Sequence, residues 1–399
     1  MRTVMKLLAC AAAATTFAVV SATPALADPP SGTTPKNADV VGVGAQTSEF
    51  VFDQFSTDYN KTLAATKPHL YAFDATNPTT GATGDSIVTK LKCKAVARPN
   101  GSNAGIKLLT TDDPTVSSHP CVDFATSSRS RATTDPTNIS FIQFAGDAVS
   151  YATQSSTNAP ANLSQQQLQE IYSCEATKWN QVGGTSKATI QPFAPQSGSG
   201  TASFWLQALG LTAFGSCVST SATQSGAAGA SANTLEQNEG VAAILVGNKN
   251  AIVPFDVGDF LSQAYHSAAC ENAGCTPDSS GKICVPTGSD NTYGCDVNGT
   301  LKLNEVAGTK PTTIWPLTKS SKGALINSKF DAQFLRDLYV VVKDAEGSIP
   351  AGEYTTLFGP RGWICGNSTA HKDLKDYGFL VLPSAGTGAV TSADCGFAS

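Results

Sequence analysis

Short apolar runs alternate with amphipathic segments along most of the chain. The runs at 39–41, 90–97, 121–125, 139–144, 189–193, 251–255 and 338–342 have the length and the β-branched or aromatic content of strands. The segments at 52–59, 106–110, 163–172, 201–209 and 257–265 carry apolar residues at helical spacing. Strands that alternate with helices predict an α/β fold.

The chain is too long for one ordinary domain, and the pattern predicts two lobes. A polar linker at 28–37 precedes the first part of lobe 1 at 38–145. Lobe 2 follows at 146–251, and 252–399 returns to lobe 1 with a cysteine-rich insertion at about 266–310. The strands at 139–144 and 251–255 both run from apolar residues through Phe into a Gly/Asp helix start, and we interpret this pair as the two crossings between lobes.

The first 27 residues have the pattern of a secretory signal peptide. Arg2 and Lys6 precede an apolar run, and Ala25-Leu-Ala27 fits the small-residue cleavage site. We therefore expect cleavage after Ala27 and a mature protein that is secreted or held at the cell envelope. The Leu-Leu-Ala-Cys motif ending at Cys10 leaves lipidation as an alternative, but it lies before most of the apolar run. No later segment is apolar and long enough to span a bilayer.

Cysteine content agrees with export. Eleven cysteines become ten once Cys10 leaves with the signal peptide, and an even number in an oxidising compartment predicts five disulfides. Sequence neighbours suggest the pairs Cys93–Cys121, Cys174–Cys217 and Cys365–Cys395, with Cys270, Cys275, Cys284 and Cys295 pairing among themselves. The spacing of these last four is unusual for zinc, so no metal is expected.

The charge balance narrows the class of ligand. The formal charge of −5 becomes −7 when Arg2 and Lys6 are removed, and an acidic chain argues against a nucleic-acid partner. An anionic ligand remains compatible, because helix N-termini and neutral hydroxyls bind anions without a net positive charge.

A glycine and hydroxyl loop at Gln196–Thr201 opens directly into the predicted helix at 201–209. Gly198 and Gly200 allow a tight turn, and Thr201 is predicted to cap the helix. The loop therefore brings backbone N–H groups, hydroxyls and the positive end of a helix dipole to one point. The same residues also fit a capped helix that binds nothing.

Two further stretches repeat this arrangement. Val41–Ser48 leads from an apolar strand through a glycine turn into a helix, and Gly101–Gly105 leads into another. Three loops of this kind, each opening a helix, favour an anion site over three unrelated caps.

In order, the motifs Gly-x-Gly-Ala-x-Thr (42–47), Gly-Ser-x-x-Gly (101–105), Asp-Phe-x-x-Ser (123–127) and Gly-Ser-Gly-Thr (198–201) make the chain resemble the phosphate-binding solute receptors of ABC importers, of the secreted actinobacterial type. The resemblance covers most of 39–265 and implies the two-lobed, type II periplasmic binding protein fold. It implies a monomeric, non-enzymatic receptor that needs no cofactor, holds phosphate or a related small anion between its lobes and delivers it to an ABC importer complex. The residues it assigns to the ligand are Gln46, Thr47, Ser102, Ser199, Gly200 and Thr201.

Two positions depart from the family pattern. Ser128 stands where the family has an aspartate that accepts the proton of phosphate and rejects sulfate, and Pro195 stands where the family has an arginine. Ser128 and Arg129 are therefore included as candidate ligand residues, with Arg131 as a second source of positive charge. The alternative is that both arginines are solvated surface cations. The departures put phosphate specificity in doubt.

Two other functions compete with the receptor. An envelope or adhesive module would keep the fold and have a lost or different ligand. A serine hydrolase would use Ser199 as nucleophile, but Gly-x-Ser-x-Gly is absent and the four histidines have no recognisable partner spacing. Nothing in the sequence assigns Glu239, Asp256 or Asp259, although each is a candidate to face the site.

Overall fold

The computed structural model describes residues 28–29, 32–77, 83–112, 119–220, 235–240, 244–266, 298–315, 323–344, 355–385 and 388–399. The predicted signal peptide and the four cysteines between 267 and 297 lie outside these ranges. None of the helices in the described ranges is long and apolar enough to cross a membrane.

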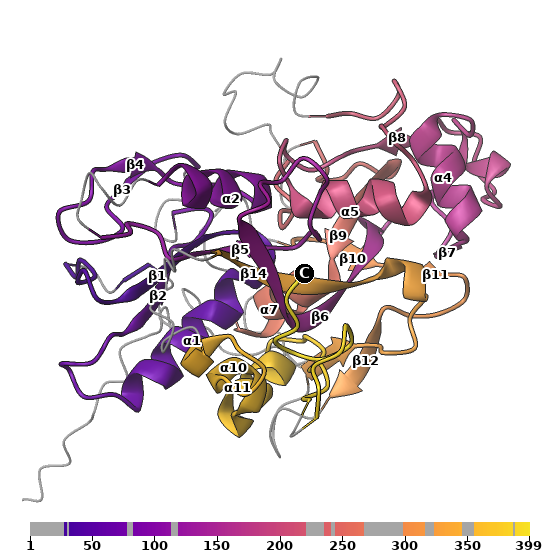
Figure 1. Cartoon of the computed structure of the whole chain (residues 1–399). Coiled ribbons are helices and arrows are strands. Elements are labelled where there is room, and N and C mark those ends of the chain that lie inside the picture. Colours follow the sequence, from indigo (N-terminus) through magenta and orange to yellow (C-terminus); the bar gives the residue numbers. More distant parts are fainter. Residues whose placement is uncertain are drawn as a thin grey trace, which may run out of the picture.

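One eight-stranded sheet runs through the molecule (Figure 1). Its order is β2 (Leu70–Ala72), β1 (Val40–Gly44), β5 (Phe124–Ser127), β14 (Leu335–Lys343), β6 (Ile139–Gln154), β9 (Ala251–Asp256) and β8 (Gln191–Pro192), with β10 (Leu301–Leu303) also paired to β6. β1 is parallel to β2 and β5, and β8 is parallel to β9. β14 is antiparallel to both β5 and β6, and β6 is antiparallel to β9.

The helices divide into two groups that flank this sheet (Figure 1). The first lobe carries α1 (Glu49–Lys61), which follows the 3₁₀ turn η1 (Gln46–Ser48), α2 (Ser102–Thr111), α7 (Val257–His266), α10 (Trp363–Gly366) and α11 (Ser368–Asp376). The second carries η2 (Trp179–Gln181), α4 (Gln165–Ser173) and α5 (Gly200–Leu209). Three two-stranded ribbons complete the fold: β3 (Ser86–Ile87) with β4 (Val96–Ala97), β7 (Asn162–Leu163) with β11 (Glu305–Val306), and β12 (Thr312–Trp315) with β13 (Gly323–Ile326).

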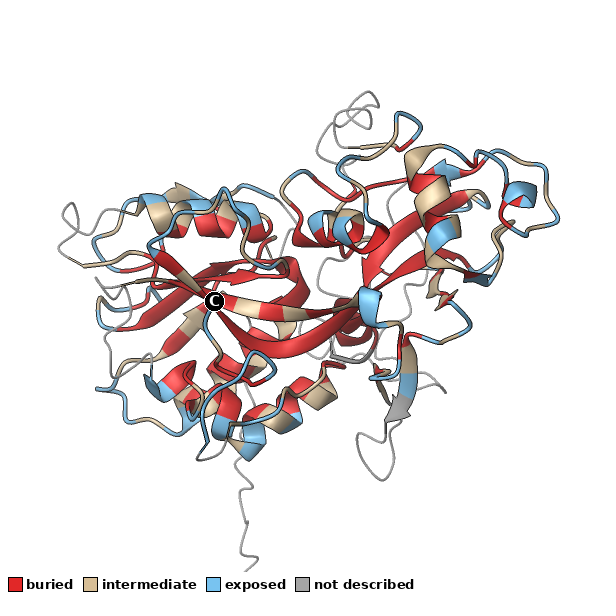
Figure 2. Cartoon of the chain, turned by 45° about the vertical axis from the view of Figure 1, so that its right-hand side comes forward, coloured by how far each residue is buried: buried red, intermediate tan, exposed pale blue. Residues whose placement is uncertain are grey.

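β6 joins the two lobes. It was predicted as a short strand at 139–144, but it continues for 16 residues because apolar and small residues extend to its end. Its first half pairs with β14 and its second half with β9 and β10. Figure 2 shows the central strands almost wholly buried, since helices and loops cover both faces. The type II α/β fold expected from the sequence is therefore confirmed.

Aromatic side chains fill the core on both sides of this junction. Phe52 of α1 packs edge to face on Phe144 of β6, with ring centroids 5.3 Å apart. In the second lobe Tyr172 of α4 packs in the same way on Trp205 of α5, at 5.6 Å. Both contacts use residues that the helical spacing had placed on apolar faces.

Several local predictions need correction. The run at 90–97 is a strand only at β4, because Lys92 has a positive φ of 66° and the buried Lys90 ammonium turns aside to Asp123 at 2.6 Å. Residues 301–306, which lie at the end of the predicted insertion, pair as β10 and β11 with β6 and β7.

Three of the predicted disulfides are confirmed: Cys93–Cys121, Cys174–Cys217 and Cys365–Cys395. The predicted linker at 28–37 is held to the first lobe at the residues that the structure describes. Pro29 and Pro35 are buried, and the carbonyl of Pro35 accepts a hydrogen bond from the Leu91 amide.

Candidate functional site

Two of the predicted loops, at 101–105 and 196–201, meet the segment after the 123–127 motif at Gly200, the first residue of α5. A Cβ built on Gly200 would lie 2.3 Å from the Ser128 hydroxyl oxygen and 2.5 Å from that of Ser102. The Ser128 amide donates to the Ser102 hydroxyl at 3.0 Å. Glycine is therefore required here by a close approach of the three chain segments.

The fourth loop joins them at the end of β1. The Ala45 amide donates to the Thr126 hydroxyl at 2.8 Å, which fixes this loop to the end of β5. Gly105 of α2 lies directly against Gly44, where an added Cβ would be 2.6 Å from the Gly44 Cα. The loops at 42–47, 101–105 and 196–201, and the third loop, which follows the 123–127 motif and contains Ser128, are thus brought together at the carboxyl ends of β1 and β5 and the start of α5.

The hydroxyls of this cluster converge on one carboxylate. Thr47 donates to Oδ2 of Asp256 at 2.5 Å, and Thr201 donates to Oδ1 of the same residue. All three side chains are buried. Thr201 was predicted as the helix cap, but Ser199 caps α5, and its hydroxyl accepts from the Ala202 amide at 3.1 Å. The Thr201 hydroxyl is therefore free of helix capping and serves the site instead.

A buried arginine balances that carboxylate. Arg336 on β14 forms ion pairs of 2.7 Å with Asp256 and with Asp147 of β6, and one of its nitrogens donates to the Thr201 hydroxyl at 3.2 Å. The other oxygen of Asp147 accepts from the Gly258 amide at 3.0 Å. Strands and helices from both lobes therefore share one charged, hydrogen-bonded cluster.

A short segment, Leu235–Gly240, covers the cluster. The Ser199 hydroxyl donates to the Gln237 amide oxygen at 2.6 Å, and the Gln237 amide nitrogen donates to Thr47 at 2.8 Å and to Asp256 at 3.2 Å. Beside it, the Glu236 carboxylate accepts from Gln46 and Asn100, each at 2.9 Å. The polar groups of the four loops are thus engaged by protein partners.

These partners are predominantly acidic. Burial, which outweighs the opposing charge of Arg336, raises the pKa of Asp147 to about 6. Burial, followed by the charges of Asp256 and Asp147, raises the pKa of Asp259 well above its usual range. Burial likewise raises the pKa of Glu236, although Asn100 and Gln46 donate to it. These carboxylates would repel an added anion. Binding would therefore require that some of them are protonated, or that the anion carries a proton that a carboxylate can accept.

Glu239 is expected to make the stability of the protein depend on pH. Burial, and next the charge of Glu236, raise its pKa to about 7. The pKa of this carboxyl is near 4.5 in the unfolded chain, so between pH 4.5 and about 7 the folded protein keeps a proton on Glu239 that the unfolded chain has lost. The free energy of unfolding therefore decreases as the pH rises through this range. In the unaltered protein we expect the free energy of unfolding to decrease by about 1 to 3 kcal/mol between pH 5 and pH 8. In the Glu239→Gln variant we expect this decrease to be absent.

Urea unfolding at the two pH values measures this effect. Glu175→Gln, the same change at an exposed residue, is the matched control and is expected to keep the full pH dependence. An unchanged pH slope in the Glu239 variant would show that this carboxyl is ionised normally in the folded protein.

A model of the PBP superfamily domain matches residues 31–351, well over half of the chain. The chain belongs to the PBP superfamily. No curated protein matches the sequence.

Three solved structures of PBP-type proteins are similar to this chain. They are an ABC-type phosphate transport receptor from Vibrio cholerae (15% identity, TM-score 0.49, 86% of this chain and 100% of that chain), a phosphate-binding protein from Stenotrophomonas maltophilia (12%, 0.48, 87% and 91%) and PstS from Borrelia burgdorferi (18%, 0.40, 86% and 98%). The family match carries the assignment, and these similarities add no argument about the ligand.

In this PBP-superfamily chain the predicted arginines have other partners. Arg129 forms an ion pair with Asp135 at 2.7 Å, and its Nε donates to Asn103 at 2.6 Å. Arg131 donates to the carbonyl of Ile139 at 3.0 Å. Of the three arginines considered, Arg336 is the one that contacts a threonine of the site. Arg336 was not predicted as a site residue, because it lies far along the chain from the four loops. A charged residue next to the apolar strand at 338–342 was the signal that could have indicated it.

Ser199 has no basic partner among the described residues. Its hydroxyl donates to an amide oxygen, that of Gln237, which cannot accept its proton as a general base. The fold of the PBP superfamily is that of non-enzymatic binding proteins. Nothing in this geometry favours the serine hydrolase.

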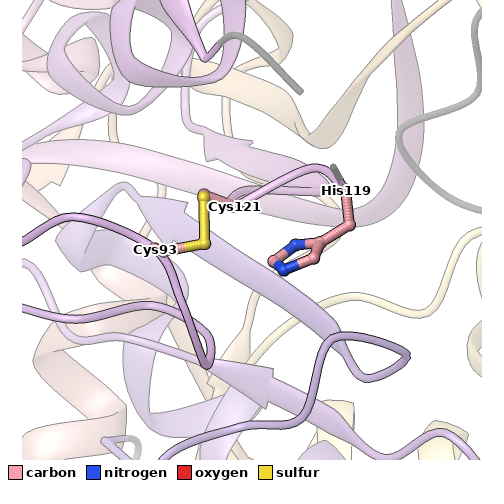
Figure 3. A group of neighbouring side chains, drawn as sticks. All are labelled: Cys93, His119 and Cys121. Atoms are coloured by element: carbon pink, nitrogen blue, oxygen red, sulfur yellow. A yellow bond between two sulfur atoms is a disulfide. The ribbon is translucent and has the colours of Figure 1, made fainter. Parts of the chain in front are cut away.

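Cys93, His119 and Cys121 are the one group in the described ranges whose ligand atoms lie close enough to hold a metal ion (Figure 3). The two sulfurs are joined in a disulfide, so neither is a thiolate that could bind zinc. The group is therefore explained by the disulfide.

Proposed function

We propose that this protein is an exported solute-binding protein that holds a small protonated oxyanion, phosphate, where its four loops meet. The observation that carries the proposal is that Ser102 and Ser128 meet at Gly200, while the hydroxyls of Thr47 and of the next residue, Thr201, meet at Asp256. Hydroxyls and the N-terminus of α5 are donors that suit phosphate oxygens. The ligand replaces the present partners of these donors.

Asp256 and Arg336 compensate for the two departures from the family pattern. The third loop has Ser128 in place of an aspartate, but Asp256 lies at the same cluster from the end of β9. When the threonine hydroxyls turn to the ligand, Asp256 accepts the O–H of hydrogen phosphate. Sulfate carries no such proton at neutral pH and is repelled by the carboxylate. Arg336 supplies the positive charge that Pro195 cannot.

The cellular setting proposed here follows from the same fold and from the N-terminal sequence. A cleaved signal peptide and disulfides fit an extracytoplasmic protein. The proposed role is a monomeric, cofactor-free receptor that passes its anion to an ABC importer complex.

A second candidate function rests on the same carboxylate. Asp256 already accepts both threonine hydroxyls, and Gln237 accepts from Ser199. The protein's own side chains then fill the site permanently, and the chain is an envelope module that has kept the fold and lost the small ligand.

Calorimetric titration of the mature, oxidised protein with phosphate and then with sulfate separates the two. The receptor is expected to bind phosphate saturably and sulfate at least about tenfold more weakly, a difference of about 1.4 kcal/mol. Asp256→Asn is expected to lose this preference, because an amide does not take the ligand's proton and no longer repels sulfate. Arg129→Gln is the matched control and is expected to leave both affinities unchanged.

The envelope module gives the opposite result. The unaltered protein would bind neither anion, and Asp256→Asn would gain binding because the donors of Thr47 and Thr201 are released. That pattern would overturn the receptor proposal.

A further inference from the structure

A second buried charge cluster surrounds Arg98, next to the anion site, and Asp259 lies near both. Its guanidinium holds the carboxylate of Asp28 with two parallel bonds, Nη1 to Oδ1 and Nη2 to Oδ2, each of 2.7 Å. The Asp74 amide donates to the same Oδ1 at 3.2 Å, and the next residue, Pro29, is buried. The residue that directly follows the predicted cleavage site is thus fastened to the first lobe.

This cluster contains more negative than positive charge. Arg98 also forms an ion pair with Asp85 at 2.5 Å, and its Nη1 donates to the carbonyl of Asp74 at 3.0 Å. Two further carboxylates, those of Glu49 and Asp74, are more than nine-tenths buried. Four carboxylates, including that of Asp28, therefore surround one guanidinium, and a fifth, Asp259, faces Glu49 from α7.

Two observations indicate a missing cation. Oδ1 of Asp74 is buried and has no hydrogen-bond partner among the residues that the structure describes. Burial, and next a neighbouring carboxylate, raise the pKa of both buried acids well above their usual range, Asp259 acting on Glu49 and Glu49 acting on Asp74. A metal ion does not fit, because these oxygens do not form a group close enough to share one ion, in the ranges searched.

We propose that signal-peptide removal supplies the missing charge, as the new α-ammonium of Asp28 pairs with the buried carboxylates of Asp74 and Glu49. A signal peptidase hydrolyses the Ala27–Asp28 bond: the hydroxyl of water goes to the Ala27 carbonyl, its hydrogen goes to the Asp28 nitrogen, and that amine takes up a proton. The amine is three covalent bonds from the Asp28 carboxyl carbon. It is therefore carried on the residue whose own carboxylate accepts from the Asp74 amide at 3.2 Å, which makes the new terminus a neighbour of Asp74.

The uncleaved chain cannot form this pair, since its Asp28 nitrogen is a neutral amide. Cleavage thus converts an uncompensated acidic cluster into a paired one and locks the new terminus to the loop after β2 and to the start of α1. The inference rests on the export part of the proposed function. Its test uses no phosphate and measures the terminus itself, so its failure is distinguishable from a failure of the anion proposal.

Three forms of the chain test the proposal: one beginning at Asp28 with a free amine, the same chain with an Nα-acetyl group, and one beginning at Ala27. The third keeps the charge but moves it by one residue. We expect the α-amino pKa of the Asp28 form, followed by NMR titration, to lie at least about one unit above the ordinary value near 8. We also expect this form to melt several degrees above the other two, as an effect of about 1 kcal/mol shifts Tm by about 2–4 °C.

Asp74→Asn ties the effect to the cluster. In the Asp74→Asn protein we expect the α-amino pKa to lie closer to its ordinary value. We also expect a smaller difference in Tm between the free and acetylated forms. Asp58→Asn, on the outer face of α1 where Asp58 pairs with Lys61, is the matched control and should leave both unchanged. An ordinary α-amino pKa with equal Tm values would overturn the proposal. So would an exported protein whose intact mass shows a first residue other than Asp28.

Discussion

Replacement of Arg336 by methionine is expected to lower the free energy of unfolding by about 3 to 5 kcal/mol. The arginine is buried and forms ion pairs with Asp147 and Asp256, which are themselves fully buried. Methionine fills a similar volume but leaves two carboxylates in the interior without a counter-charge. Breaking a buried pair by removing one partner costs much more than the pair itself contributes.

Urea unfolding at pH 7 measures this loss. Arg129→Met is the comparison, because its ion pair with Asp135 is less buried and its removal leaves one carboxylate without a counter-charge instead of two, so it is expected to cost less. Adding Asp147→Asn and Asp256→Asn to the Arg336 variant removes the stranded charges and is expected to restore part of the stability. Similar losses for the two arginines would show that the buried cluster is not held by its charges.

Replacement of Gly200 by alanine is expected to separate the loops of the site. The new methyl group would lie 2.3 Å from the Ser128 hydroxyl and 2.5 Å from the Ser102 hydroxyl, so these segments must move. Overpacking of this kind is expected to cost about 1 to 3 kcal/mol of stability. If the site holds phosphate, affinity is expected to fall at least about tenfold, because the donors no longer meet at one point.

The serine hydroxyls provide the internal test. Removing both, with Ser102→Ala and Ser128→Ala in the Gly200 variant, makes room for the methyl group and is expected to recover stability without recovering phosphate affinity. Gln207→Ala, on the exposed side of the same helix, is the control for a change in α5. A Gly200→Ala protein with unaltered stability would show that the three loops are further apart than described.

Helix caps and glycine turns could be predicted from the sequence, because they depend on residues close together in the chain. The capping box of Ser164 and Gln167 forms as its spacing predicts, and each glycine and hydroxyl loop lies beside the others. The error at 90–97 arose where a distant partner outweighed local propensity. Lys90 is drawn to Asp123, and Cys93 is tied to Cys121.

The charged centre of the site was the part that the sequence could not supply. Asp256 was a candidate without a role, and its partner Arg336 comes from β14, separated from Thr201 by 135 residues. Gln237 lies in a segment with no periodic pattern, so nothing marked it as a partner of Ser199. Such contacts depend on which strands become neighbours, and strand order is a long-range property that periodicity does not encode.

The continuity of β6 has a mechanical consequence. A single strand of 16 residues is hydrogen-bonded to β14 in one lobe and to β9 and β10 in the other. Neither half of the molecule can lose its sheet without exposing the backbone groups of a strand that the other half needs. Under an applied force the chain is therefore expected to unfold as one cooperative unit. If the chain is cut between 145 and 146, neither fragment is expected to fold alone.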